Sequence, residues 1–306
     1  MKFTTSDIAG ITLGKLTGDP NLIISEIITD SRHFSLNDGL AFIAIKGQNH
    51  DGHAFIDSLF KRGIRSFIVE KMPVDPESYE GSAFILTRNT VEALQLIAAE
   101  VRKSFTSPVI AVTGSAGKTV VKEWLADILG LSVPVLRSPK SFNSQIGVPL
   151  SVLRLEEKYK MGIFEAGISK ANEMGKLRDV INPDIGIITN IGDAHSENFP
   201  DQAAKAREKL KLFINASLIV YCSDHDLIHK LITEDPYLQQ KMLIDWSLHN
   251  KDAIVYTEIK NQSEGNTSVE VSFRDKSFEF LIPFDDRASV ENAITVLTVC
   301  LALQTD

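Results

Sequence analysis

The chain has 306 residues, of which 43% are hydrophobic and 24% are charged, so it is long enough to build two globular cores. Its formal net charge of −8 and its scattered lysines and arginines argue against nucleic-acid binding, because a phosphate backbone needs a basic face. No apolar run approaches the roughly 20 residues of a membrane span. With only Cys222 and Cys300 and no signal-like N-terminus, the sequence favours a cytoplasmic location.

The first part of the chain, residues 1–104, is predicted to form a separate α/β domain. Short apolar runs predict strands at residues 22–28, 40–45, 66–69 and 83–86, and amphipathic segments predict helices at residues 55–62 and 90–104. The pattern changes near residues 105–108, where we place a domain boundary.

The second part, residues 105–306, alternates short apolar strands with helices. This alternation is typical of a mostly parallel sheet flanked by helices. Residues 254–282 alternate apolar and polar side chains around the turn 274–276, which predicts a hairpin appended to that sheet. The fold class expected for the whole chain is therefore α/β, with a smaller domain preceding a P-loop domain.

Residues 113–119, TGSAGKT, lie between the apolar run 108–112 and an amphipathic helix predicted at 120–131. Strand, glycine loop and helix in this order indicate a phosphate-binding loop, because backbone N–H groups and the helix N-terminus attract anions. Lys118 is expected at the outer phosphates and Thr119 on Mg²⁺. The residues expected to hold the nucleotide are Gly114, Ser115, Ala116, Gly117, Lys118 and Thr119. Val112 stands where the usual Walker pattern has glycine, and an ordinary glycine turn is the alternative interpretation.

Polar residues also follow the other predicted strands of this domain. They are Glu165, then Asn190 with Asp193 and His195, then Asp224. Ligands collect at the carboxyl ends of parallel strands, so these side chains are expected to surround one cleft with the phosphate loop. Glu165 and His195 are then candidate partners of Mg²⁺ beside Thr119. A helix cap, or a hydrogen-bonded structural histidine, is the alternative for each of them.

Several motifs occur in a fixed order along this domain. They are the short phosphate loop, the segment 141–150 that contains Asn143, the segment 164–167 around Glu165, and the segment 189–195 that ends at His195. Together they resemble the Mur ligases, the ATP-dependent amide ligases of peptidoglycan precursor synthesis, over essentially the whole chain. The form of the second and third motifs is similar to the member that adds D-alanyl-D-alanine to UDP-N-acetylmuramoyl-tripeptide. The resemblance implies ATP and Mg²⁺ as cofactors and a substrate contact from Asn143.

The first domain carries the segments 29–32, TDSR, 44–47, AIKG, and 51–55, DGHAF. They resemble the uridine-nucleotide motifs that this ligase shares with the amino-acid-adding ligase of the preceding step. The resemblance implies that Ser31, Arg32 and Lys46 bind the UDP moiety. A surface turn with a solvated charge is the alternative interpretation, and it is the one that these residues alone would favour.

Two motifs depart from the family pattern. Lys209 stands where the family has a lysine carbamylated to a metal-binding carboxylate, but Lys211 follows where an acid is usual. Carbamylation needs a neutral amine, so Lys209 must lie where burial or nearby cations lower its pKa, and a solvated lysine is the alternative. The adenine-contacting motif keeps only Asn292. The resemblance thus implies Lys118, His195 and Lys209 as catalytic residues.

The chemistry implied by the resemblance begins with phosphorylation of the tripeptide carboxylate by ATP. The amine of D-alanyl-D-alanine then attacks the acyl phosphate. The resemblance stops at a helix over residues 290–302, so we expect the C-terminal ligase domain to be absent and the chain to be an inactive fragment, with a fused alanine racemase as one option for the parent. The alternatives are the preceding Mur ligase, a P-loop kinase or NTPase, and a UDP-sugar and ATP binding module without turnover.

Overall fold

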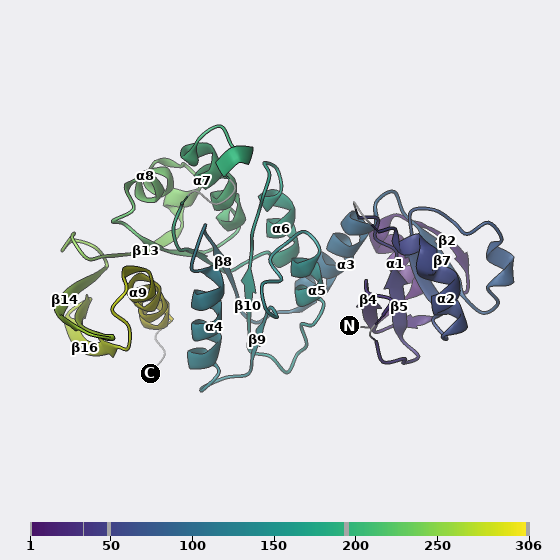
Figure 1. Ribbon diagram of the computed structural model, residues 1–306, viewed down its shortest axis with the longest axis horizontal. Coiled ribbons are helices and arrows are strands. Elements are labelled where there is room, and N and C mark those ends of the chain that lie inside the picture. Colours follow the sequence, from purple (N-terminus) through teal and green to yellow (C-terminus); the bar gives the residue numbers. More distant parts are fainter. Residues whose placement is uncertain (1, 33, 48–49, 193–195, 304–306) are drawn as a thin grey trace. The chain divides into compact units, whose positions relative to one another are not determined.

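The computed structural model describes residues 2–32, 34–47, 50–192 and 196–303 of the chain. The chain divides into two compact units, which are coloured along the sequence in Figure 1. The first comprises Met1–Phe105 with Val152–Glu156, and the second comprises Thr106–Ser151 with Glu157–Asp306. Within the described ranges, no helix has the length and apolar character needed to cross a membrane.

The first unit is built on a mostly parallel sheet. Its described residues form five strands in the order β2, β7, β6, β5, β4, of which only β2 runs antiparallel to its neighbour. Their bounds are β2 Lys15–Gly18, β4 Glu26–Ile28, β5 Leu40–Ile43, β6 Ser66–Val69 and β7 Ala83–Leu86. A separate antiparallel pair consists of β1 Phe3–Thr4 and β3 Ile23–Ile24. The helical segments are α1 Thr5–Thr12, η1 Gly52–Phe55, α2 Ile56–Lys61, η2 Pro76–Ser78 and α3 Thr90–Ser104.

Most sequence predictions for this unit are confirmed, although the strand predicted at 40–45 ends at Ile43 and the helix predicted at 55–62 is divided between η1 and α2. β6, β7 and α3 have the predicted bounds. The single strand predicted over 22–28 is wrong, because β3 and β4 pair with different partners. Helix α1 was not predicted, although a capping box marks its start. Thr4 Oγ1 accepts from Asp7 N at 3.0 Å, and Asp7 Oδ2 accepts from Thr4 N at 2.8 Å.

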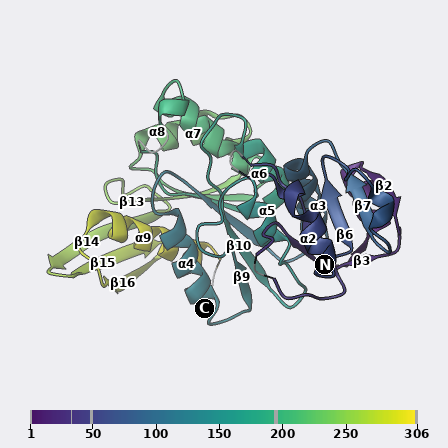
Figure 2. The same cartoon turned by 45° about the vertical axis from the view of Figure 1, so that its right-hand side comes forward.

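The second unit is built on a larger sheet. Its described residues form nine strands in the order β16, β15, β14, β13, β12, β11, β8, β10, β9. All neighbouring pairs between β9 and β14 in this order are parallel, whereas β15 runs antiparallel to both of its neighbours, β14 and β16. The bounds are β8 Val109–Thr113, β9 Val135–Arg137, β10 Met161–Glu165, β11 Ile185–Ile188, β12 Leu218–Cys222, β13 Met242–Ser247, β14 Val255–Ser263, β15 Asn266–Phe273 and β16 Lys276–Ile282. The predicted α/β class and the predicted hairpin are therefore confirmed (Figure 2).

The central strands β8, β10, β11 and β12 are buried along their whole length, because helices cover both faces of a parallel sheet. The helical segments are α4 Lys118–Leu129, α5 Gly147–Val152, α6 Met174–Ile181, η3 Ser196–Asn198, α7 Gln202–Leu210, η4 Lys211–Phe213, α8 Asp226–Glu234, η5 Leu238–Gln240 and α9 Arg287–Ala302. Alternate strand residues such as Ile110 and Val112 share one core with Val121 of α4 and Ile294 of α9. α4 and α9 also contact each other, so one face of the sheet is covered by the helix that starts at the phosphate loop and the last helix.

Candidate nucleotide and metal site

The loop between β8 and α4 has the backbone of a glycine-dependent turn. Gly114 has φ +145° and Gly117 has φ +79°, both in the region that L side chains rarely adopt. A Cβ on Gly114 would lie 2.0 Å from Thr189 Oγ1, and one on Gly117 would lie 2.3 Å from Asn292 Oδ1. Both glycines are therefore required by conformation and by space, and Asn292 of α9 lies directly against the loop.

The end of the neighbouring strand β11 holds this loop in place. Ser115 N donates to Asn190 O at 2.8 Å and Ala116 N donates to Asn190 Oδ1 at 3.0 Å. Thr189 Oγ1 donates to Ala116 O at 2.5 Å. Asn190, predicted from sequence only as a polar residue at a strand end, therefore fixes the turn of the loop together with Thr189.

Glu165, the last residue of β10, lies beside the loop and is 1% exposed. β10 pairs with β8 so that Glu165 is opposite Val112, which explains its position. Thr119 Oγ1 donates to Glu165 Oε2 at 2.7 Å, and Asn143 Nδ2 donates to Glu165 Oε1 at 2.6 Å. The structure thus brings together three of the residues singled out in the sequence analysis.

This arrangement fits a hard divalent cation. The buried Glu165 carboxylate is held by a hydroxyl group and an amide group, and carboxylate, hydroxyl and amide oxygens are the ligands that Mg²⁺ prefers. No group of three or more His, Cys, Asp or Glu side chains in the described ranges is arranged to hold a metal ion, so a cation here would rely on Thr119 and on ligand oxygens as well. His195, predicted as a further metal partner, lies outside the described residues.

Three lysine side chains lie around the loop. Lys209 of α7 is 3% exposed and its Nζ donates to Gly114 O at 3.0 Å. Burial, reinforced by the charges of Lys118 and Lys205, lowers the pKa of Lys209 to about 7. Burial also lowers the pKa of Lys118, although the charge of Glu165 opposes this. With a pKa near 7, the Lys209 amine can be neutral near physiological pH.

The depressed pKa of Lys209 predicts a specific dependence of stability on pH. An unfolded lysine keeps the ordinary value of 10.5, so between about pH 7 and 10.5 the unfolded chain binds one more proton than the folded chain. The free energy of unfolding should therefore rise with pH across this window. Lys209→Met should flatten most of this rise, as measured by urea titrations in CO₂-free buffer. The exposed Lys103→Met serves as the control that keeps it, and an unchanged rise in Lys209→Met would contradict the assignment.

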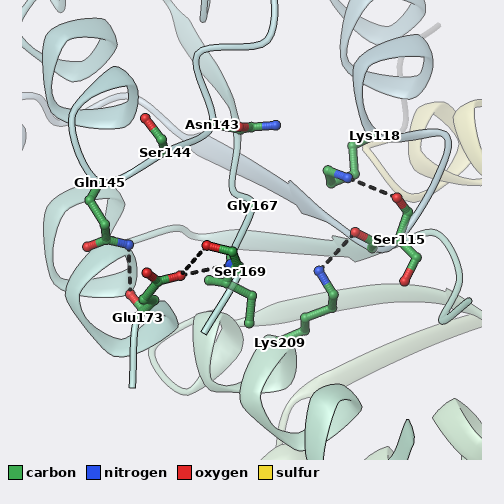
Figure 3. Close-up of a pocket in the computed structure, with 11 residues that line it drawn as sticks. Ser115, Lys118, Asn143, Ser144, Gln145, Gly167, Ser169, Glu173 and Lys209 are labelled. Atoms are coloured by element: carbon green, nitrogen blue, oxygen red, sulfur yellow. Dashed lines mark hydrogen bonds between the residues drawn. The ribbon is translucent and has the colours of Figure 1, made fainter. Parts of the chain in front are cut away.

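A cavity of about 270 Å³ opens next to the loop (Figure 3). Lys118 and Lys209 line one side, and Ser144, Gln145 and Ser169 lie across from them in the close-up. On that second side, Glu173 Oε2 accepts from Ser169 N at 2.8 Å, and Gln145 Nε2 donates to Glu173 O at 3.2 Å. The cavity therefore has a cationic side beside the phosphate loop and a polar, hydrogen-bonded side opposite.

Asp224, also at a strand end, has a different role. Its Oδ2 accepts from Leu248 N at 2.7 Å and its Oδ1 accepts from Ser247 Oγ. The carboxylate thus joins the ends of β12 and β13. The expected convergence of all the polar strand ends on one cleft is therefore supported for Glu165 and Asn190, whereas Asp224 serves a structural contact.

The candidates of the first unit lie at the carboxyl ends of adjacent parallel strands. Ser31 and Arg32 follow β4, and Lys46 follows β5. The Arg32 guanidinium forms a bidentate pair with Asp30, with Nε–Oδ1 at 2.9 Å and Nη2–Oδ2 at 2.8 Å, and its side chain is 76% exposed. Both cations are therefore on the surface, at the edge of the sheet where ligands of parallel folds bind.

His53, from the third motif of this unit, has a structural role. Its Nδ1 lies 2.6 Å from Asp51 Oδ1, and its Nε2 accepts from the backbone N of Glu70 at 2.9 Å. Because Nε2 accepts a hydrogen bond, Nδ1 carries the ring proton and donates a hydrogen bond to the carboxylate. The Glu70 side chain in turn accepts from Thr90 N at 2.7 Å, so the motif ties the end of β6 to the start of α3.

Comparisons with known proteins assign the family. The Mur ligase middle domain matches residues 112–300, and the catalytic domain of the Mur ligase family matches residues 23–129. The chain is 29% identical to the UDP-N-acetylmuramoyl-tripeptide–D-alanyl-D-alanine ligase of Bacillus subtilis over 97% of its length and 63% of the relative. It is 31% identical to the enzyme of that name from Borreliella burgdorferi, covering 92% of the chain and 61% of the relative.

Solved structures agree with this assignment. A crystal structure of MurF from Acinetobacter baumannii superposes with a TM-score of 0.89 at 25% identity, over 100% of this chain and 66% of that one. The chain thus spans somewhat less than two thirds of these relatives. Since the middle-domain match alone extends from residue 112 to residue 300, the chain belongs to the Mur ligase family.

Proposed function

We propose that this chain supplies the UDP-substrate and ATP sites of a ligase that adds D-alanyl-D-alanine to UDP-N-acetylmuramoyl-tripeptide. The observation that carries the proposal is a cavity lined by the phosphate loop, by the near-neutral Lys209 and by Asn143, which donates to the buried Glu165 carboxylate behind it. Relatives that bear the name of this activity match nearly the whole chain. In the proposed reaction, the tripeptide carboxylate takes the terminal phosphoryl group of ATP, and the dipeptide amine then displaces phosphate from the acyl phosphate.

The proposed roles follow from the need to hold a carboxylate and a triphosphate together. Lys118 would face the outer phosphates, because its amine lies at the cationic side of the cavity. Thr119 and Glu165 would hold Mg²⁺, which when bound neutralises phosphate charge, and Asn143 would orient the Glu165 carboxylate from its second oxygen. His195 stays a proposed third metal partner.

The nucleotide base and the sugar nucleotide are each assigned to their own set of residues. We assign the adenine end of ATP to Asn292, since it lies against Gly117 at the start of α4. The UDP moiety is assigned to Ser31, Arg32 and Lys46 of the first unit. The support for this second assignment is the position of these residues at the carboxyl ends of β4 and β5.

Lys209 is proposed to be carbamylated. A neutral amine adds to CO₂, forming an N–C bond and releasing one proton, and the lowered pKa of Lys209 supplies the neutral amine. With ¹³C-bicarbonate, wild-type protein should give a carbamate NMR signal that Lys209→Arg lacks. If wild-type protein gives no such signal at saturating bicarbonate, Lys209 acts as an amine instead.

Arg32→Ala should weaken binding of the UDP-muramoyl tripeptide about tenfold, because a hydrogen bond to a charged group contributes about 1.5–3 kcal/mol. Isothermal titration with the purified chain measures this. Lys61→Ala is the matched control, since Lys61 is also an exposed cation of the first unit, paired with Asp57. Equal affinities for wild type and Arg32→Ala would remove Arg32 from the substrate site.

The proposed function is tested by the ligands that stabilise the chain. UDP-N-acetylmuramoyl-tripeptide and Mg-ATP should each raise the melting temperature, because a ligand that binds only the folded state stabilises it. A larger shift with the UDP-linked dipeptide than with the tripeptide would favour the amino-acid-adding ligase instead. A response to Mg-ATP alone would favour a P-loop kinase. Phosphate release that depends on D-alanyl-D-alanine then separates a ligase from a binding module.

A further inference from the structure

A lysine with no role in the proposed site is completely buried in the phosphate-loop helix. Lys122 of α4 is 0% exposed and follows Thr119 by one helical turn. Its Nζ donates to Ser138 O at 2.8 Å and to Lys140 O at 2.6 Å, and lies 2.8 Å from Glu123 Oε1. An ammonium group has three N–H donors, so all of them have acceptors here. Removing an ion from water costs several kcal/mol, so the burial of this charge needs an explanation beyond packing.

The two carbonyls belong to the segment that delivers Asn143 to Glu165. Ser138 anchors the start of this segment, since its N donates to Ile163 O at 3.0 Å and its Oγ accepts from Glu165 N at 3.4 Å. Lys140 has φ +47°, in the left-handed region that a lysine rarely adopts. The hydrogen bond that its carbonyl accepts from Lys122 Nζ therefore stabilises an unfavourable turn of the segment.

The segment ends at Asn143, beside the proposed metal ligand Glu165. Gly167 N donates to Asn143 O at 2.8 Å, and Asn143 Nδ2 donates to Glu165 Oε1 at 2.6 Å. The other oxygen of Glu165 accepts from Thr119, which lies on the same helix as Lys122. The two oxygens of the Glu165 carboxylate are thus bonded by Thr119 and by Asn143. Lys122 connects these two groups, because it lies on the same helix as Thr119 and bonds the segment that contains Asn143.

We propose that Lys122 is a positioning residue for the cation site, fixing the segment 138–143 to α4 so that Asn143 and Thr119 orient one Glu165 carboxylate. The proposal rests on the proposed function only in taking Mg-ATP as the ligand of this site. Mutation of a residue that hydrogen-bonds to and orients a metal ligand commonly lowers metal affinity about 10- to 100-fold. A lysine in an amphipathic helix normally lies on the solvated face, so sequence patterning gives no sign of this role.

The test compares ATP affinity with and without Mg²⁺ in the purified chain. In Lys122→Met, the factor by which Mg²⁺ increases ATP affinity should fall about tenfold. In the ligand-free protein, hydrogen exchange of the backbone amides of residues 138–143 should become faster. Leu129→Ala removes a buried side chain from the other end of α4 and is the control for lost stability. It should lower the melting temperature but keep the Mg²⁺ factor and the slow exchange.

A double-mutant cycle identifies the route of the effect. If Lys122 acts through Asn143, Lys122→Met should add little to the loss of the Mg²⁺ factor in Asn143→Ala. An unchanged factor in Lys122→Met, or additive losses, would overturn the proposal. Should Lys122→Met not fold, Lys122→Gln, whose shorter amide cannot reach both carbonyls, gives the same comparison. Wild-type ATP binding that ignores Mg²⁺ would count against the proposed function instead.

Discussion

Lys118→Ala is expected to lower ATP affinity roughly 100-fold, since two charge-assisted hydrogen bonds to phosphate contribute about 3 kcal/mol or more. The physical reason is the position of the amine. Lys118 lines the cavity, donates to Ser115 O at 3.2 Å and interacts electrostatically with Glu165. No other cationic side chain comes from the loop itself. Titration calorimetry with Mg-ATP measures the loss.

The fold of Lys118→Ala should survive, because the lysine lies at the first position of α4 and outside the hydrophobic core. An unshifted melting temperature verifies this. Lys103→Ala, which removes an exposed lysine of α3 paired with Glu100, should bind ATP like the wild type. If Lys118→Ala retains wild-type affinity, residues 113–119 do not form the phosphate site.

Gly117→Ala should impair both stability and nucleotide binding. The new Cβ would lie 2.3 Å from Asn292 Oδ1, and φ +79° costs a non-glycine residue about 1–2 kcal/mol. Asn292 has little freedom to move away from the new Cβ, because it lies on α9, which is packed against α4. We expect the free energy of unfolding to fall by about 2–4 kcal/mol, with ATP binding reduced beyond detection.

A second glycine of the same unit provides the matched control. Gly175 lies in α6, and a Cβ there would meet no atom within 4 Å. Gly175→Ala should therefore stabilise the protein by about 0.5–1 kcal/mol, because alanine loses less backbone entropy in a helix. Urea unfolding of the two variants compares them directly. Equal stability of Gly117→Ala and wild type would mean that the loop can rearrange without cost.

The fold was predictable where local pattern and burial coincide. The helix Thr90–Ser104 has both an N-cap, Asn89, and a continuous apolar face, and its predicted bounds are confirmed. The prediction for α4 began at residue 120, whereas the helix begins at Lys118, because the sequence analysis assigned those residues to the loop. β3 and β4 were merged for a similar reason, since an apolar run carries no information on which strand pairs with which.

The site was predictable in its residue types but not in its connections. Strand order places β10 and β11 on either side of β8, and no periodicity in the sequence specifies that order. The contact between Glu165 and Thr119 depends on it. Likewise, the lowered pKa of Lys209 depends on burial and on the charges of Lys118 and Lys205. Lys205 is buried, although its place in a charged helix predicts a surface position.

The anchoring of the phosphate loop by β11 determines how a nucleotide would be received. Thr189 and Asn190 fix the turn through hydrogen bonds within the protein, before any ligand takes part. A loop that a ligand had to order would subtract that conformational entropy from the affinity. In this protein the loop is already ordered in the folded chain, so a nucleotide can bind without paying the entropy of ordering residues 113–119. The speed of nucleotide exchange would then be governed by how fast the ligand leaves and not by rearrangement of residues 113–119.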